Sequence, residues 1–182
     1  MYPKSVVNYP FRRGKRVYLR AYEPEDDEHS LRWFNDPLIT QWLDAGAFPL
    51  SRQSQKERAE RFRTNSEDLV LAVCKEENDL HIGNIGFHNI SHTTRNAEIG
   101  VVIGERTLHG KGYGSEAIEL MVKYGFESLN LRRIYLRVLG NNEAALKSYE
   151  KFGFQREGVL REHAYKDGQY LDQVIMGLLR SE

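Results

Sequence analysis

The sequence predicts a single α+β domain in which a mostly antiparallel, twisted sheet of about six or seven strands carries about four helices on its faces. Three observations lead to this class. The predicted elements run in the order strand, helix, helix, three strands, helix, strand, helix, two strands. One strand–helix–strand unit, over 96–139, requires a parallel pair. The 182 residues contain no long linker, so we expect an N-terminal extension over 1–14 and one domain over 15–182.

The first part of the domain is expected to hold one strand and two helices. Residues 17–22 alternate apolar and polar, which is typical of a strand. A helix is expected over 25–35, and the following "DPL" ends it because the residue before a proline disfavours the helical conformation. Residues 39–50 are expected to form a loop or a short helical turn. The polar segment 51–64 predicts a helix whose Lys and Arg side chains face solvent.

Three consecutive strands are expected next, over 69–75, 81–90 and 96–103. The first two are joined by the short polar segment "EENDL", which is typical of a hairpin turn. The three strands should therefore form an antiparallel meander.

The C-terminal part alternates helices and strands. The segment 115–129 repeats apolar residues at helical spacing and predicts an amphipathic helix. A strand is expected over 132–139, and a helix over 141–152 that ends at a glycine. The last two strands are expected over 154–163 and 170–179.

The composition argues against several classes of function. Lys plus Arg equals Asp plus Glu, at 26 each. The chain therefore lacks the basic surplus that is typical of nucleic-acid-binding proteins. The single cysteine, Cys74, lies in an apolar run and is expected to be a buried hydrophobe. The histidines and the cysteine show no metal-ligand spacing, so no metal is expected. The start lacks the apolar core of a signal peptide, and no run approaches about 18 apolar residues, so we expect a cytoplasmic protein without a membrane partner.

The segment "IGERTLHGKGYGSEA" places glycines at every second position, Gly110, Gly112 and Gly114, between a strand and a helix. Free backbone N–H groups and the helix dipole make such a turn an anion site, for which phosphate is the natural guest. The dinucleotide-binding pattern does not fit, because the third glycine comes one residue early. The P-loop pattern does not fit either, because Lys111 is followed by a glycine and the spacing is wrong.

A third pattern fits. "HGKGYG" matches Q/R-x-x-G-x-G/A except at its first position, where His109 stands. "NNEAALKSYEKFGF" matches N-x-x-A-x-x-x-Y-E-K-x-G-F, beginning at Asn142 and including Tyr149. By these two motifs the sequence resembles the GNAT N-acetyltransferases over about residues 15–180. Its first helix region and its C-terminal segment resemble the branch that holds ribosomal-protein N-terminal and spermidine acetyltransferases.

The resemblance implies a GNAT-like fold whose central parallel strands splay apart to admit the pantetheine arm of acetyl-CoA. It implies that the N–H groups from about Lys111 to Ser115 hold the pyrophosphate and that Asn142 hydrogen-bonds near the thioester. The neutral imidazole of His109 offers less charge to a phosphate than a guanidinium, so binding is expected to be weaker or pH-sensitive. The implied cofactor-binding residues are Val101, Val102, Ile103, His109, Gly110, Lys111, Gly112, Tyr113, Gly114, Ser115, Asn142, Ala145 and Tyr149.

Acetyl transfer to an amine requires a base for the amine, donors for the oxyanion and an acid for the departing thiolate. The resemblance implies Tyr149 as the acid; the alternative is that Tyr149 packs in the core or hydrogen-bonds coenzyme A. Glu98 is the candidate base. A carboxylate in so apolar a strand is unusual, and removal of a proton from the amine, directly or through water, would explain it. The alternative for Glu98 is an ion pair with Arg95 or with an arginine of another strand. The backbone N–H of Val101 is the candidate oxyanion donor.

The acceptor pocket is expected from residues 25–50 and the final hairpin. The four consecutive acidic residues at 25–28 offer a site for a polyamine, although they fit better as a negative first helical turn. Candidate pocket residues, each with core packing as the alternative where aromatic, are Trp33, Trp42, Phe48, His88, His163, Tyr165 and Asp167.

The predicted function is therefore transfer of the acetyl group of acetyl-CoA to a primary amine within a ternary complex. The retained Tyr149 favours a small molecule such as a polyamine or an amino sugar, because family members that acetylate proteins often lack it. A protein N-terminus is the alternative acceptor, and a non-catalytic acyl-CoA sensor is a further alternative. Homodimers are common in this family, so a homodimer stays open.

Overall fold

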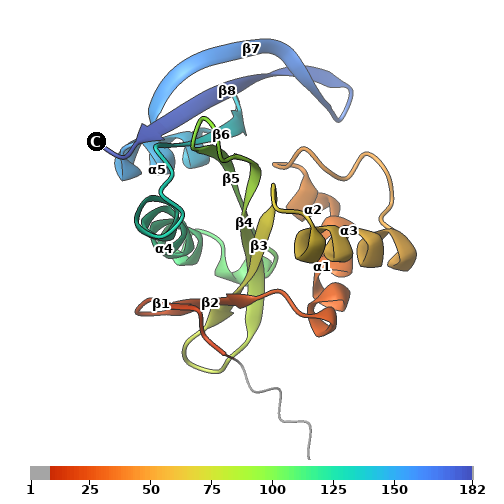
Figure 1. The fold of residues 1–182 in the computed structure, drawn as a ribbon. Coiled ribbons are helices and arrows are strands. Elements are labelled where there is room, and N and C mark those ends of the chain that lie inside the picture. The colour runs from red at the N-terminus through yellow and green to blue at the C-terminus, as the bar shows by residue number, and fades with distance from the viewer. Residues whose placement is uncertain (1–8, 182) are drawn as a thin grey trace, which may run out of the picture.

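The computed structural model describes residues 9–181 as one eight-stranded sheet with helices on both faces (Figure 1). The strands lie in the order β1-β2-β3-β4-β5-β6-β8-β7. The strands are β1 (Arg12–Arg13), β2 (Val17–Ala21), β3 (Leu69–Lys75), β4 (His81–Ser91), β5 (Asn96–Ile103), β6 (Arg133–Leu139), β7 (Gln155–Lys166) and β8 (Gln169–Leu179). The α-helices are α1 (Asp27–Phe34), α2 (Pro37–Thr40), α3 (Arg52–Thr64), α4 (Tyr113–Glu127) and α5 (Glu143–Phe152), and two short 3₁₀ helices cover Pro24–Asp26 and Arg106–Leu108.

The pairing of the strands confirms the predicted fold class. Strands β3, β4 and β5 form the antiparallel meander, and β5 and β6 form the parallel pair. The final hairpin β7–β8 joins the sheet through β8, which pairs with β6.

One strand adds to the predicted set. Strand β1 lies within the segment 1–14 that was expected to be an extension, and Arg12 pairs with Leu19 of β2. The Phe11 ring next to it packs edge-on against Tyr124 of α4, at 5.0 Å between centroids. Helix α2 is the short helical turn that was one of the two expectations for residues 39–50, although it begins earlier, at Pro37, because Asp36 caps it by accepting from the Leu38 N–H. The folded unit in the described residues therefore starts before residue 15.

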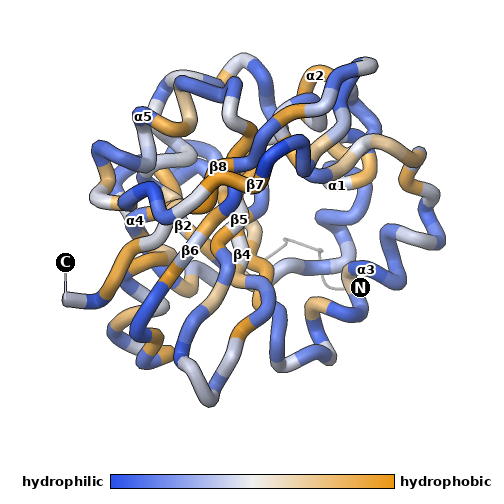
Figure 2. The backbone as a smooth tube through the Cα atoms, turned by 90° about the horizontal axis from the view of Figure 1, so that it is seen from above, coloured by the Kyte–Doolittle hydropathy of each residue, from blue (hydrophilic) through white to orange (hydrophobic). Residues whose placement is uncertain are grey.

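The main core lies between the central strands and helix α4. Helices α4 and α5 lie on one side of the sheet, and α1, α2 and α3 lie on the other (Figure 1). Figure 2 shows the apolar residues gathered along the central strands, whereas α3 is largely hydrophilic. Helix α4 approaches the sheet closely at Gly125, where a Cβ would lie 2.7 Å from the Phe87 ring and 3.1 Å from Ile134. A larger residue at Gly125 would push the helix off the sheet.

The parallel pair diverges halfway along its length. Its register runs from Asn96 opposite Arg133 to Glu98 opposite Tyr135 and then stops. Beyond that point β5 stays paired with β4 as far as Ile103, and β6 stays paired with β8 as far as Leu139. The edge of β5 that faces β6 is therefore free of sheet partners after Glu98, and this is the splay that the family resemblance implied.

Candidate active site

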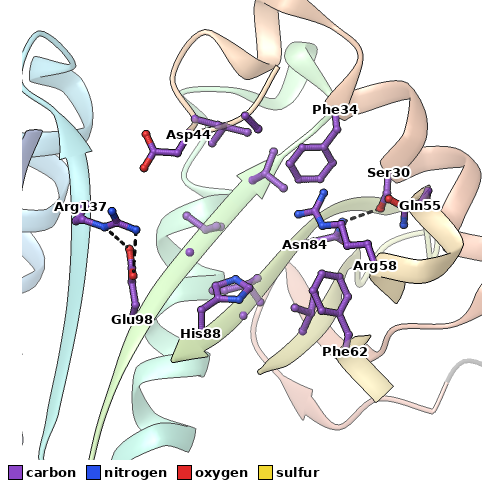
Figure 3. Close-up of a pocket in the computed structure, with 18 residues that line it drawn as sticks. Ser30, Phe34, Asp44, Gln55, Arg58, Phe62, Asn84, His88, Glu98 and Arg137 are labelled. Carbon is purple, nitrogen blue, oxygen red and sulfur yellow. Dashed lines mark hydrogen bonds and ion pairs between the residues drawn. The ribbon is translucent and has the colours of Figure 1, made fainter. Parts of the chain in front are cut away.

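Two cavities meet at the splay. One lies between the diverging strands and is lined by Val138 of β6, by Tyr149 of α5 and the N-cap residue Asn142, and by Gly100 and Val101 of β5. The second lies on the side of α1 and α3, and Gly100 and Val101 line it as well (Figure 3). Two molecules that enter from opposite sides of β5 would therefore meet at its middle.

The glycine loop leads into helix α4 through two left-handed residues. Gly110 has φ +71° and Gly112 has φ +83°, a region that L side chains rarely adopt. Gly112 is the N-cap of α4, so the N–H groups of the first turn, beginning at Tyr113, have no carbonyl one turn earlier to bond. The Lys111 N–H donates to Leu108 O at 3.4 Å. The anion-binding donors therefore fit Tyr113 to Ser115 better than the Lys111 end of the predicted range.

A clamp from the N-terminal hairpin holds this loop. The Arg16 guanidinium donates to Lys111 O at 2.8 Å, to Gly112 O at 3.2 Å and to Glu116 Oε2 at 2.9 Å. Glu116 Oε1 accepts from the backbone N–H groups of Lys15 and Arg16. Burial raises the pKa of Glu116, but the hydrogen bonds from the Arg16 backbone and side chain outweigh it and lower the pKa, so the carboxylate stays charged. The loop is thus preorganised by residues far away in sequence.

His109 ties the loop to β5. Its Nε2 lies 2.6 Å from the carbonyl oxygen of Ile103, so this nitrogen carries the proton and donates. The imidazole therefore fixes the end of the strand through Nε2, and its contact with a phosphate stays a prediction.

The second motif forms helix α5 as expected. Asn142 caps the helix by accepting from the Ala145 N–H at 3.2 Å, which leaves its side-chain NH₂ as a donor. The Tyr149 ring packs edge-on against Phe154 at 5.8 Å between centroids. Burial raises the pKa of Tyr149 to about 12, so its hydroxyl keeps its proton at neutral pH.

Glu98 forms the ion pair that was the alternative to a base. It accepts from Arg137 Nε at 2.8 Å and Nη2 at 3.3 Å, and from Asn89 Nδ2 at 3.3 Å. The hydrogen bond to Glu98 raises the pKa of Arg137 despite the burial of the guanidinium. Both oxygens of Glu98 are therefore engaged, and its role as a base stays a prediction.

Two of the candidate acceptor residues line the cavities at the splay. His88 lines the second cavity, and Trp42 lines the cavity between the strands. Trp33 instead is buried against Gly104, where a Cβ would collide with its indole. The remaining candidates are exposed: Phe48, His163, Tyr165 and Asp167.

The acidic run at 25–28 does not line either cavity. Asp26 is buried and bound to Arg20 by two hydrogen bonds of 2.7 Å. Asp27 accepts from the Tyr22 hydroxyl at 3.0 Å, and Glu28 pairs with an arginine of α3. These contacts join α1 to the sheet and to α3, which is a structural role.

Sequence reasoning missed the wall of the second cavity that α1 and α3 supply. Arg58 lies between two aromatic rings, 4.0 Å from the Phe34 centroid and 5.5 Å from the Phe62 centroid (Figure 3). Burial lowers the pKa of Arg58. Gln55, Arg58 and Phe62 share one helical face at spacings of three and four residues, and that pattern was the available signal. The expectation that the basic side chains of this helix face solvent is wrong for Arg58, which is partly buried against the two rings.

Among residues 9–181, no group of three or more His, Cys, Asp or Glu side chains is placed to hold a metal ion. Within the same residues, no helix has the length and the apolar character needed to cross a membrane.

Comparisons with known proteins agree with this geometry. The family model described as "Acetyltransferase (GNAT) domain" matches residues 16–155. Spermidine N(1)-acetyltransferase of Escherichia coli K12 is 35% identical over 166 residues, which cover 91% of this chain and 87% of that protein. The putative ribosomal N-acetyltransferase YdaF of Bacillus subtilis is 30% identical over 174 residues, covering 93% and 94%.

The solved structures include spermidine N-acetyltransferase from Vibrio cholerae in complex with CoA and spermine. It has a TM-score of 0.85 at 27% identity, covering 92% of this chain and 98% of that one. Among the sequence relatives, the uncharacterized N-acetyltransferase p20 of Bacillus licheniformis is 31% identical over 170 residues, which cover 92% of this chain and 95% of that protein. The family match, the relatives and the splayed sheet lead to one conclusion: this chain belongs to the GNAT acetyltransferase family.

Proposed function

We propose that this protein transfers the acetyl group of acetyl-CoA to the primary amine of a small molecule, by direct attack within a ternary complex. The observation that carries the proposal is the meeting of two cavities at Gly100 and Val101. Such an arrangement brings a donor and an acceptor together on one strand, so a bimolecular reaction becomes effectively unimolecular within the complex.

The residues present fit acetyl-CoA, which supplies the activated thioester. The first-turn N–H groups of α4 suit its pyrophosphate. The open edge of β5 from Val101 to Ile103 offers backbone groups to a pantetheine arm, since β6 no longer pairs there. Asn142 lines the cavity between the diverging strands and offers its amide NH₂ there.

Within this complex each residue has a defined task. Tyr149 would donate its hydroxyl proton to the departing sulfur, and the N–H of Val101 would bind the oxyanion. Both residues line the cavity between the strands.

Two carboxylates, Asp44 and Glu98, and two arginines, Arg58 and Arg137, line the acceptor pocket. Glu98 pairs with Arg137, and Asp44 accepts from Gln173 at 2.6 Å. Spermidine acetyltransferases among the relatives and the solved structures support a polyamine as the acceptor. The ribosomal relative supports a protein N-terminus as the second candidate.

Release of the CoA thiol, measured with a panel of amines, tests the proposal. The panel contains spermidine, spermine, glucosamine, lysine and a short peptide with a free N-terminus. We expect the highest kcat/KM with a small molecule. Turnover of the peptide alone would instead establish the second candidate, and tight acetyl-CoA binding without turnover of any amine would contradict the proposal and favour a sensor.

The positive charge of Arg58 is expected to repel a polycationic acceptor. Replacing it with glutamine should raise kcat/KM for spermidine about fivefold, because about 1 kcal/mol of charge repulsion is removed from a partly desolvated site. The gain for the monoamine glucosamine should be smaller. Arg61→Gln is the matched control, since Arg61 lies on the same helix but is exposed. Equal gains for both amines, or the same gain from Arg61→Gln, would contradict a role for Arg58 in acceptor selection.

A further inference from the structure

A histidine faces the acceptor pocket from the strand next to β5. His88 lies on β4 directly opposite Glu98 in the β4–β5 register. Its side chain is 36% exposed, and its imidazole points into the pocket between β5 and the rings of Phe34 and Phe62 (Figure 3). The Phe62 ring lies 6.4 Å away, between centroids. The group is therefore accessible to an acceptor without being fully solvated.

A carboxylate fixes the orientation of this imidazole. His88 Nδ1 lies 3.0 Å from Asp68 Oδ1, and the Asp68 side chain is only 14% exposed. Asp68 Oδ2 accepts from Asn65 Nδ2 at 2.9 Å, so the carboxylate is itself held in place. An ionised carboxylate only accepts, so Nδ1 must donate the proton. In neutral His88 the lone pair therefore stands on Nε2.

Nε2 borders the space above Gly100. A Cβ built on Gly100 would lie 3.6 Å from His88 Cδ2 and 3.7 Å from Nε2, and it meets no closer atom. Because glycine leaves this space empty, an acceptor nitrogen can occupy it within reach of the imidazole. Gly100 is also where the two cavities meet, so the same space adjoins the thioester in the proposed complex.

The other candidate base is less available. Both oxygens of Glu98 are engaged by Arg137 and Asn89, whereas Nε2 of His88 has its lone pair free under the Asp68 pairing. A group that is positioned by a second residue and directed at the reacting atom is the arrangement that general bases share.

We propose that His88 is the proton acceptor for the amine and that Asp68 is its positioning residue; this rests on the proposed function. The acceptor enters as an ammonium, and His88 Nε2 takes one proton from it. The nitrogen lone pair forms the C–N bond to the acyl carbon, and the C–S bond breaks. The sulfur gains the Tyr149 proton, and Tyr149 regains one from the acetylated nitrogen. His88 then releases its proton to solvent, so one proton is released in each turnover.

Several charged groups surround His88 and enter any pH profile. Asp68 contacts it directly, and Glu98 stands opposite on β5. The charged lining of the same pocket is completed by Arg58 of α3, by Arg137 of β6 and by Asp44, which lies between α2 and α3. The profile must therefore be compared between variants and not assigned from the parent enzyme alone.

The test is the pH dependence of kcat/KM for spermidine and glucosamine in His88→Gln, Glu98→Gln and the control His92→Gln, which alters an exposed turn. We expect His88→Gln to lose about a hundredfold in kcat/KM at neutral pH, together with the acid limb of the profile. Glu98→Gln and His92→Gln should keep that limb. Free imidazole should restore part of the rate of His88→Ala. Retention of the acid limb in His88→Gln, or its loss in Glu98→Gln alone, would overturn the proposal.

Asp68→Asn separates positioning from catalysis. An amide can present its NH₂ to Nδ1 and so favours the other tautomer, which puts the proton on Nε2. We expect the imidazole ¹⁵N shifts of His88 to report Nδ1–H in the parent protein and Nε2–H in Asp68→Asn, with a fall in kcat. This readout needs no turnover. Nε2–H in the parent would overturn the pair even if no amine on the panel reacts, and absence of turnover with the Nδ1–H tautomer intact would count only against the proposed function.

Discussion

Replacing Asp26 with alanine is expected to lower the free energy of unfolding by about 3–5 kcal/mol, because it leaves a buried guanidinium without its partner. Asp26 is 3% exposed and Arg20 is 8% exposed. Their two hydrogen bonds are 2.7 Å each, and His81 Nδ1 lies 3.0 Å from the same carboxylate. Urea unfolding at neutral pH measures the loss. Glu25→Ala is the control, since that acid is exposed and is expected to cost less than about 0.5 kcal/mol.

The pH dependence of this difference checks its cause. Burial alone would raise the pKa of Asp26, but the hydrogen bonds from Arg20 and then from His81 lower it well below its usual range. A carboxyl with a lowered folded pKa contributes its stability above the unfolded pKa of about 3.9 and loses it as the pH falls further. The gap between parent and Asp26→Ala should therefore be full above about pH 5 and should shrink below about pH 4. A loss under about 1 kcal/mol, or a gap that does not change with pH, would contradict the ion pair as its source.

The sequence predicted those elements whose structure is determined by residues close to one another along the chain. The glycine loop could be predicted because glycine readily adopts φ values such as +71° at Gly110 and +83° at Gly112, which other residues adopt rarely. The parallel pair followed from a strand–helix–strand unit, and a connection of that length leaves few other pairings. In contrast, the clamp of Arg16 on the loop depends on contacts about 95 residues apart, and no local pattern marks them.

The pairing of His88 with Asp68 shows why register limits a sequence prediction. Near the turn, Cys74 pairs with His81, and this register continued along β3 would bring Phe87 level with Asp68. A bulge after Val73 shifts the pairing by one residue, so Leu69 pairs with Phe87 and Asp68 comes level with His88. A one-residue slip moves every side chain to the other face of the sheet, so the catalytic proposal depends on a feature that no spacing in the sequence reveals.

Replacing Tyr149 with phenylalanine is expected to lower kcat about a hundredfold, in the range typical of a lost general acid. Burial raises the pKa of the hydroxyl to about 12, so the proton stays on the phenolic oxygen in the ground state and moves only when the sulfur becomes negative. CoA thiol release at saturating acetyl-CoA measures the loss. Tyr165→Phe is the control, because that phenol is 61% exposed at the end of the β7–β8 hairpin.

The affinity for CoA decides between the roles of Tyr149. The phenylalanine ring can keep the edge-on contact with Phe154, so packing in α5 should survive and the melting temperature should hold. An acid acts only after the C–S bond begins to break, so its removal lowers kcat and leaves the Kd of CoA unchanged. A tyrosine that merely binds coenzyme A would give the opposite result, in which Kd rises and kcat is kept. That pattern in Tyr149→Phe would contradict the acid and would leave the departing thiolate to take its proton from solvent in the cavity.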